Sequence, residues 1–303
     1  MHTVVVQNLF KKYGKLTAVD DFSFSAEKGS ILALVGPDGA GKTSAFRSVC
    51  GLIEFDSGTV NIAGYDIDKQ FNSIKPLLGY MPQNFSLYPD LSVEENLSFY
   101  AGLFGIRKSE FKEKAKHLYE FSGLEPFASR RAEVLSGGMK QKLALSCNLI
   151  HDPEILILDE PTTGVDPLSR RQFWGILSML KGEGSTIIVS TPYMDEVALA
   201  DKAIFIHDGK KLAEEKPSEL TSYFKGDTYR IDFTPTIDQL ERLNKTDGLS
   251  ARRFGASIHV YIDSGCTLNQ FQSEFKQGGI DISRLTTINP DLEDTFIQLM
   301  GNK

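Results

Sequence analysis

The sequence ILALVGPDGAGKTS occupies residues 31–44. Its first five residues are all apolar, which predicts a strand buried on both faces. The glycine-rich turn that follows fits the pattern G-x-x-x-x-G-K-[ST], and the helix-like residues 42–50 come directly after it. A strand, a glycine loop and a helix in this order predict an α/β fold with a phosphate-binding loop of the P-loop NTPase kind.

The residue types in this loop suit a nucleotide. Glycines let backbone N–H groups turn towards phosphates, and the start of the helix adds positive potential. Lys42 can reach the outer phosphates, and the Thr43 hydroxyl can bind Mg²⁺. A chance glycine turn is the weaker interpretation because the strand and the helix flank the motif as it requires. ATP and Mg²⁺ are therefore the expected ligand and cofactor, and the expected contacts in the loop are Gly36, Pro37, Asp38, Gly39, Ala40, Gly41, Lys42, Thr43 and Ser44.

A second buried strand is predicted at residues 155–158, and it ends in Asp159 and Glu160. Asp159 is expected in the Mg²⁺ shell, and Glu160 is expected to polarise the water that attacks the γ-phosphate. Two acids at the end of a strand are common, so this pair alone is a modest signal. Downstream of the glycine loop it predicts a catalytic site for ATP hydrolysis.

Composition narrows the class of protein. The chain of 303 residues has a net charge of -7, with no broad basic surface of the kind that attracts nucleic acid. Cys50, Cys147 and Cys266 are far apart and outside any paired metal-ligand spacing, which favours a reducing compartment. No signal peptide is predicted, and the apolar runs are far shorter than a membrane span of about 20 residues. Any role at a membrane is expected to come through a partner.

The wider pattern predicts two domains, at residues 1–225 and 226–303. The first is expected to combine an antiparallel β layer, a mostly parallel core sheet and a helical insertion at about 84–150. Within that insertion, Ser92 is a natural N-cap with Glu95 three residues on, and Leu97, Ala101 and Phe104 form an apolar helix face. Elements of the first domain are expected as strands at 4–10, 18–24, 59–62, 77–81 and 186–190 and as helices at 108–120 and 167–181. The second is expected to be a small α+β domain with strands at 229–233 and 257–262 and helices at 236–243 and 268–275.

Residues 135–142, LSGGMKQK, resemble the signature of the ABC ATPases. Ser136, Gly137 and Gly138 would stand at a helix start, where a hydroxyl and unshielded N–H groups can bind a phosphate. An ordinary Ser-Gly-Gly helix cap is the alternative, but it predicts none of the neighbouring motifs. The resemblance extends over residues 3–220.

Further motifs match this family. Gln83 in YMPQ resembles the glutamine that contacts the metal and the attacking water and relays to a membrane subunit. Residues 163–167, TGVDP, resemble the D-loop. Tyr13 falls where the family stacks an aromatic ring on adenine, although for Tyr13 alone a packing role is the better interpretation. Residues 85–91 fall where the family forms a groove for the coupling helix of a membrane subunit, with a packed loop as the alternative.

The resemblance implies a head-to-tail dimer with a second ABC ATPase subunit, in which ATP lies between the glycine loop of one chain and the signature of the other. It also implies a separate integral-membrane permease, through which alone the chain would reach the membrane, and a peripheral place on its cytoplasmic face. Residues 140–142 and 289–296, NPDLEDTF, resemble ATPases of ABC-2-type exporters of drugs and other amphiphiles.

The chain departs from the family at Pro192, which replaces a switch histidine in the run STPYMDE at 190–196. Losing one preorganised donor at a catalytic site costs on the order of 10²–10³ in rate. Two interpretations stay open: a slow site paired with a competent, different ATPase, or a homodimer that hydrolyses through Glu160 alone. Asp38, where asparagine is more usual, is expected to point outward or to contact the opposite subunit, with a modest effect.

Two other classes of function are considered. ABC ATPases of ribosomes usually carry two cassettes, and those of DNA repair carry long coiled coils or zinc-binding cysteines, whereas this chain has one cassette and neither feature. An ATP-gated subunit with little hydrolysis is supported only by Pro192.

Overall fold

The apolar run of residues 31–35 forms β3 (Ile31–Val35), every residue of which is buried. In this computed structural model, which describes residues 2–84 and 87–301, β3 lies inside a six-stranded sheet of order β10-β9-β3-β8-β7-β6. β3 pairs in parallel with both of its neighbours, and only β10 runs antiparallel to the strand beside it. The other strands are β6 (Leu78–Met81), β7 (Ile155–Asp159), β8 (Thr186–Thr191), β9 (Lys202–His207) and β10 (Lys210–Glu215).

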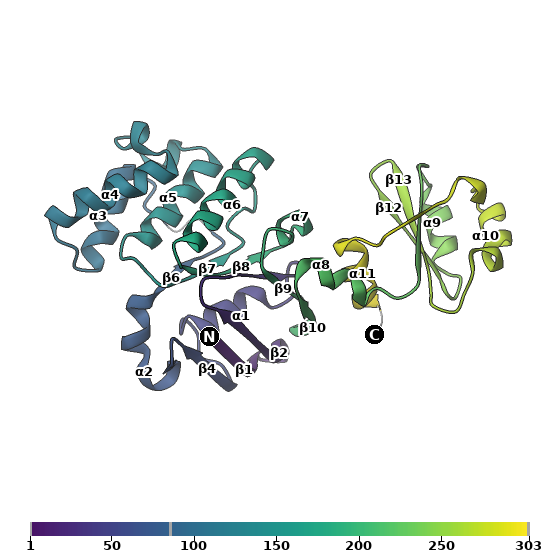
Figure 1. Ribbon diagram of the computed structural model, residues 1–303, viewed down its shortest axis with the longest axis horizontal. Helices are drawn as coiled ribbons and strands as arrows, with labels where there is room; N and C mark the ends of the chain where they lie inside the picture. Colours follow the sequence, from purple (N-terminus) through teal and green to yellow (C-terminus); the bar gives the residue numbers. More distant parts are fainter. Residues whose placement is uncertain (1, 85–86, 302–303) are drawn as a thin grey trace. The chain divides into compact units, whose positions relative to one another are not determined.

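A second, antiparallel sheet has the order β2-β1-β4-β5, and it confirms the expected hairpin layer. Helix α1 (Lys42–Val49), which begins in the glycine loop, packs against both sheets (Figure 1). Its Phe46 and Val49 join one apolar cluster with Val6 of β1 and Ile157 of β7. The strands of this sheet are β1 (His2–Tyr13), β2 (Leu16–Glu27), β4 (Ser57–Ile62) and β5 (Tyr65–Asp66).

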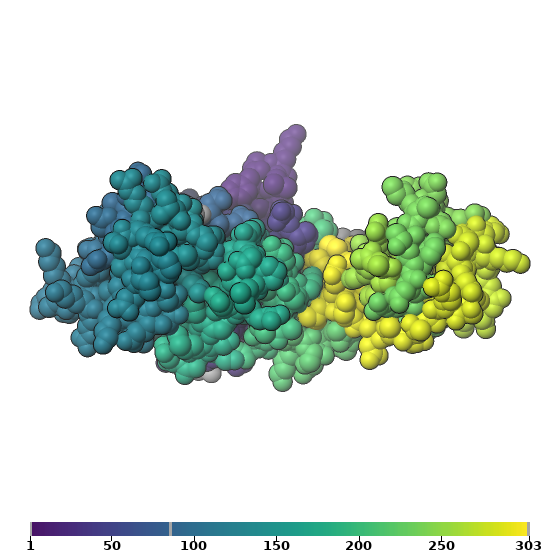
Figure 2. All heavy atoms as spheres, turned by 90° about the horizontal axis from the view of Figure 1, so that it is seen from above, coloured from purple at the N-terminus to yellow at the C-terminus, as the bar shows by residue number. Residues whose placement is uncertain are grey.

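The helical insertion contains α3 (Val93–Leu103), α4 (Lys108–Ser122) and α5 (Gly137–Leu149). Seen from above, these helices form the blue to teal part of the surface, with α6 (Pro167–Gly182) beside them (Figures 1 and 2). The expected capping box at Ser92 and Glu95 is present. The apolar face is shorter than expected, because Phe104 is the C-cap of α3, is 38% exposed and stacks on His151. Shorter helices are α2 (Ile67–Ile74), α7 (Met194–Val197) and α8 (Pro217–Leu220).

The chain divides into two units, Met1–Pro217 and Ser218–Lys303, whereas the sequence pattern places the break after residue 225. The second unit has an antiparallel sheet of order β12-β13-β11-β14 with its own apolar core. The expected helix at 268–275 is a 3₁₀ turn (Leu268–Phe271) followed by α10. The elements of this unit are β11 (Asp227–Ile231), α9 (Ile237–Leu243), β12 (Leu249–Phe254), β13 (Ser257–Ile262), α10 (Gln272–Gln277), β14 (Thr286–Ile288) and α11 (Leu292–Gly301). In the described part of the chain, no helix is long and apolar enough to cross a membrane.

Candidate nucleotide-binding site

The glycine loop between β3 and α1 runs so close to other backbone that two of its glycines have no room for a side chain. A Cβ on Gly36 would lie 2.2 Å from the carbonyl oxygen of Ile206. A Cβ on Gly41, whose φ is 104°, would lie 2.2 Å from the carbonyl oxygen of Ala18. Because Gly41 is also the N-cap of α1, no side chain of the cap competes for the first-turn N–H groups, which suit a phosphate.

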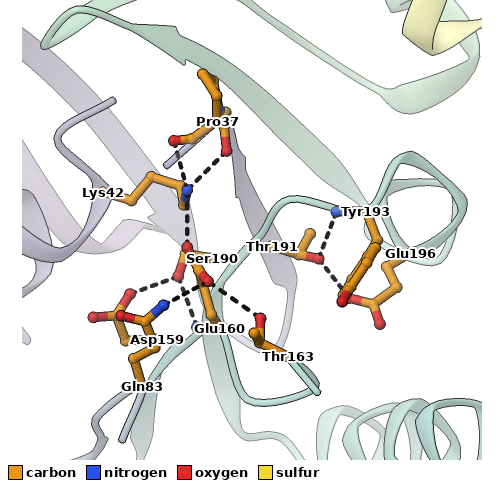
Figure 3. A network of polar contacts seen from close by, with 11 residues as sticks. Pro37, Lys42, Gln83, Asp159, Glu160, Thr163, Ser190, Thr191, Tyr193 and Glu196 are labelled. Atoms are coloured by element: carbon orange, nitrogen blue, oxygen red, sulfur yellow. Dashed lines mark hydrogen bonds and ion pairs between the residues drawn. The ribbon is translucent and has the colours of Figure 1, made fainter. Parts of the chain in front are cut away.

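Lys42 is 3% exposed, and its side chain turns back over the loop. Its ammonium donates to the carbonyl oxygens of Gly36 at 2.7 Å and Pro37 at 2.9 Å. The same nitrogen lies 2.9 Å from Oε1 of Glu160, as Figure 3 shows. The loop therefore holds a buried positive charge beside the carboxylate that ends β7.

The Glu160 carboxylate contacts three side chains, those of Lys42, Gln83 and Thr163. The φ of Glu160, 47°, lies in the left-handed region, which is uncommon for a residue other than glycine. Its Oε2 accepts hydrogen bonds from Nε2 of Gln83 at 2.9 Å and from the Thr163 hydroxyl at 3.2 Å. Residues that are far apart in sequence thus meet at one carboxylate, which lies within reach of the glycine loop.

Asp159, next to Glu160, is fully buried. Its Oδ1 accepts a hydrogen bond from Ser190 at 2.7 Å, whereas its Oδ2 has no hydrogen-bond partner among the described residues. Burial raises the pKa of Asp159, and the hydroxyls of Ser190 and Thr43 oppose part of that rise. A buried carboxylate oxygen without a partner is costly unless a cation binds it, and Mg²⁺ prefers oxygen ligands. Asp159 and the Thr43 hydroxyl beside it therefore offer oxygen ligands of the kind that Mg²⁺ prefers, with the Gln83 amide in the same cluster.

A cleft of about 620 Å³ opens over this cluster. Tyr13 stands at its edge, 46% exposed, with the Lys11 ammonium 5.1 Å from the centre of the ring. Asp38 is exposed and also lines the cleft. Four lining residues, Leu16, Thr17, Ala18 and Asp208, were not anticipated from the sequence, because β2 and the β9–β10 turn bring them there. The lining consists of Tyr13, Leu16, Thr17, Ala18, Asp38, Gly39, Ala40, Gly41, Lys42, Thr43, Ser44, Gln83, Glu160 and Asp208.

Ser136, Gly137 and Gly138 do not line this cleft. Ser136 is the exposed N-cap of α5, and its hydroxyl accepts from the Met139 N–H at 3.3 Å. A Cβ on Gly138 would lie 2.6 Å from Cβ of Ser169, so this glycine allows α5 to approach α6 closely. Within one chain the structure brings Lys42, Gln83, Asp159 and Glu160 together and leaves the signature elsewhere.

The segment after β8, which contains Pro192, is anchored through Glu196. The hydroxyls of Thr162 and Thr191 donate to Oε2 of Glu196 at 3.0 Å and 2.6 Å. Tyr193 lies beside Glu196 and away from Lys42 (Figure 3), and the Arg170 guanidinium stacks 4.0 Å from its ring centre. Pro192, which has no N–H, offers a phosphate no donor.

Sequence reasoning missed these supporting residues. Ser190 contacts Asp159 and Glu160 across the pairing of β7 with β8, and Thr162 reaches Glu196 from a distant part of the chain. Thr163 and Glu196 lie within the runs TGVDP and STPYMDE, but these motifs do not show which side chains the two residues contact. The available signal was a pair of hydroxyl residues, Ser190 and Thr191, directly after the apolar residues 187–189 of β8.

Residues 85–91 were expected to form a partner groove, and Phe85 and Ser86 lie outside the described residues. Leu87 is buried, whereas Tyr88 is 46% exposed and packs its ring 4.7 Å from that of Phe99. The described part of this loop therefore combines a packed anchor with an exposed aromatic surface.

The sequence is similar to one family of known proteins and to individual members of it. Residues 19–163 match the family described as ABC transporter. The chain is 39% identical over 236 residues to the probable multidrug ABC transporter ATP-binding protein YbhF of Escherichia coli, covering 78% of this chain but only 40% of that relative's length. It is 38% identical over 300 residues to the Nod factor export ATP-binding protein I of Ralstonia nicotianae, covering 98% and 94% of the two chains.

A solved structure shares the fold. The dimeric ATP-binding cassette MJ0796, in a post-hydrolysis state bound to ADP and Pi, superposes with a TM-score of 0.64 at 25% identity. The match covers 70% of this chain and 98% of that one.

Proposed function

Because this chain belongs to the family of ABC transporter ATP-binding proteins, which hydrolyse ATP, we propose that it powers the export of drugs or other amphiphilic molecules through a separate membrane permease. The relatives named for multidrug transport and for Nod factor export support the direction and the class of cargo. The observation that carries the proposal is the contact of Glu160 with both Lys42 and Gln83 beside the glycine loop.

In the proposed reaction, ATP binds over the glycine loop with its adenine against Tyr13. The negative phosphates draw the Lys42 ammonium away from the loop carbonyls and from Glu160, since an ammonium binds phosphate strongly. The Glu160 carboxylate is then available to accept a proton from a water molecule that Gln83 orients. That water attacks the γ-phosphorus, the bond to the β–γ bridging oxygen breaks, and ADP and phosphate result.

Mg²⁺ would be held by Asp159, Thr43 and Gln83, where it would neutralise phosphate charge. Support for this set comes from the buried Oδ2 of Asp159, which has no hydrogen-bond partner in the part of the chain that the structure describes. Ser44, which lines the cleft beside Thr43, is the further hydroxyl proposed for the nucleotide.

ABC ATP-binding subunits act with permeases and form dimers. The MJ0796 cassette is an example of such a dimer. For this chain we propose a head-to-tail dimer with a second ATPase subunit, identical or different. The position of Ser136 outside the cleft supports it, since a second chain would be needed to bring a signature to the ATP. Through the permease, the dimer would sit on the cytoplasmic face of the membrane, with the loop at Tyr88 as part of the contact.

Pro192 is proposed to slow hydrolysis at this site, because it contributes no donor and Tyr193 lies with Glu196 rather than Lys42. Single-turnover hydrolysis by wild type, Glu160→Gln and Pro192→His tests this, with ATP affinity measured alongside. We expect slow turnover in wild type, loss in Glu160→Gln, and a gain on the order of 10²-fold in Pro192→His at unchanged affinity. Pro126→His, an exposed proline outside the cleft, is the matched control.

Two outcomes would contradict the proposal at different points. If Glu160→Gln still hydrolyses ATP at the wild-type rate, Glu160 is not the base, and the proposed catalytic site is wrong. Rapid wild-type turnover that Pro192→His leaves unchanged would remove only the slow-site hypothesis, and a self-sufficient homodimer would then be the simpler assembly.

A further inference from the structure

Ser190 lies at the end of β8, directly opposite Asp159 in the parallel pairing of β7 with β8. It is fully buried, as is Asp159. Its hydroxyl oxygen accepts a hydrogen bond from the backbone N–H of Glu160 at 2.9 Å and donates one to Oδ1 of Asp159 at 2.7 Å, as Figure 3 shows. One hydroxyl therefore contacts both acidic residues of the site, one through its side chain and one through its backbone.

The directions of these two bonds follow from the groups involved. A backbone N–H can only donate, so the Ser190 oxygen must accept from Glu160. The single hydroxyl proton is then committed to the Asp159 carboxylate. Neither bond can be replaced by water without a rearrangement, because Ser190, Asp159 and Glu160 are all at most 3% exposed.

The hydrogen bond from the Glu160 N–H to the Ser190 hydroxyl stabilises the backbone conformation of Glu160. With a φ of 47°, Glu160 is in a strained backbone conformation that persists only where the surroundings enforce it. Ser190 binds the N–H of that residue, and this anchors the turn that directs the Glu160 carboxylate at Lys42. Without the anchor, the turn can relax and the carboxylate can move.

The bond to Asp159 bears on the orientation of its carboxylate. The Ser190 hydroxyl donates to Oδ1, whereas Oδ2 has no hydrogen-bond partner within residues 2–84 and 87–301. A fixed carboxylate presents that oxygen in one direction, and such outer hydrogen bonds to metal ligands typically matter by 10–100-fold in metal affinity or activity.

We propose that Ser190 is a positioning residue for ATP hydrolysis, whose one hydroxyl fixes the direction of the Asp159 carboxylate and the backbone turn of Glu160 together. This inference rests on the proposed function of the site. It predicts that the metal dependence of ATP binding and the rate of hydrolysis respond to the same hydroxyl, although Ser190 touches neither ATP nor the cation.

The test compares Ser190→Ala and Ser190→Thr in the full-length chain. We measure the single-turnover rate and the ratio of the ATP Kd in EDTA to the ATP Kd in MgCl₂. Ser190→Ala is expected to lower the rate about 10–100-fold and to shrink the Kd ratio about tenfold, with the Kd in EDTA unchanged. Ser190→Thr, which keeps the hydroxyl, is expected to restore most of both.

Ser48→Ala is the matched control, because Ser48 is also a fully buried serine and its hydroxyl has no hydrogen-bond partner among the described residues. It should change neither quantity. If Ser190→Ala is too unstable at the assay temperature, Ser190→Cys keeps nearly the same volume with a weaker hydrogen bond and carries the same comparison.

A folded Ser190→Ala or Ser190→Cys with a normal rate and a normal Kd ratio would overturn the inference. So would a rate loss that Ser190→Thr does not relieve while its thermal unfolding matches wild type. Failure of the proposed function is distinguishable, because it appears as equal hydrolysis by wild type and Glu160→Gln, whatever Ser190 does.

Discussion

At the scale of single residues, the site joins a positive and a negative charge in a buried place. Lys42 and Glu160 are 3% exposed each and pair at 2.9 Å. Removing one partner of such a pair leaves the other buried and uncompensated, which costs about 3–5 kcal/mol. Phosphate binding escapes this cost for Lys42, because a new anion replaces the carboxylate. The ion pair with Glu160 therefore explains how the Lys42 ammonium can be buried before ATP binds.

Two glycines of the loop make a matched test of backbone geometry. Gly39 and Gly41 both have positive φ, but a Cβ on Gly39 meets open space whereas one on Gly41 meets the Ala18 carbonyl at 2.2 Å. Gly41→Ala is expected to displace the loop and weaken ATP binding at least tenfold. Gly39→Ala carries only the strain of the left-handed conformation, of order 1 kcal/mol. Equal ATP affinities for the two variants, measured by titration, would contradict this assignment.

At the scale of elements, α3 and the loop before it are tied by one side chain. Asn96 is fully buried, and its Nδ2 donates to the carbonyl oxygens of Tyr88, Leu91 and Ser92, while its Oδ1 accepts from the Tyr88 N–H. Because the loop carries the exposed Tyr88 and follows Gln83, Asn96 fixes a surface that lies next in sequence to the catalytic cluster.

Asn96→Ala should therefore loosen this loop. Its loss removes the acceptor of the Tyr88 N–H, while the carbonyl oxygens of Tyr88, Leu91 and Ser92 each keep a backbone donor. A cost of about 1–3 kcal/mol is expected in the free energy of unfolding. Amide hydrogen exchange in the loop at residues 87–92 should accelerate more than amide exchange within α3. Asn148→Ala is the control. Among the described residues, the Asn148 side chain makes a single hydrogen bond, to the Ala144 carbonyl oxygen within α5. Comparable effects from both variants would show that Asn96 has no special hold on the loop.

At the scale of the whole molecule, each unit has an apolar cluster formed by its own described residues. One joins β1, β2, β3, α1 and β7, and the other is built from residues of the second unit alone. All residues that line the nucleotide cleft belong to the first unit. Each unit can therefore bury its own apolar surface.

A chain truncated after Lys225 should bind ATP with the affinity of the full-length chain. The cut preserves α8, where Leu220 is buried, and removes the second sheet entirely. Isothermal titration with ATP checks the affinity, and sedimentation with ATP shows whether the dimer needs residues 226–303. A large loss of ATP affinity in a folded truncated chain would contradict the separation of the two units.

The sequence by itself determined the parts whose geometry is local. The buried β3, the glycine loop and α1 follow one another within a few residues, so apolar runs, glycine and a helix start describe them fully. The acids that end β7 and the Ser92 capping box are equally local. The family resemblance, carried by motifs of this kind, is confirmed by the comparisons.

Only the tertiary structure decided how distant residues meet. The hydroxyl of Ser190 reaches Asp159 and Glu160 because β7 and β8 pair in one register, and a shift of one residue would turn it to the other face of the sheet. The position of Ser136 outside the cleft also depends on how elements pack. In the second unit, sequence analysis did not predict the edge strands β12 and β14, because the identity of an edge strand depends on the neighbour with which it pairs.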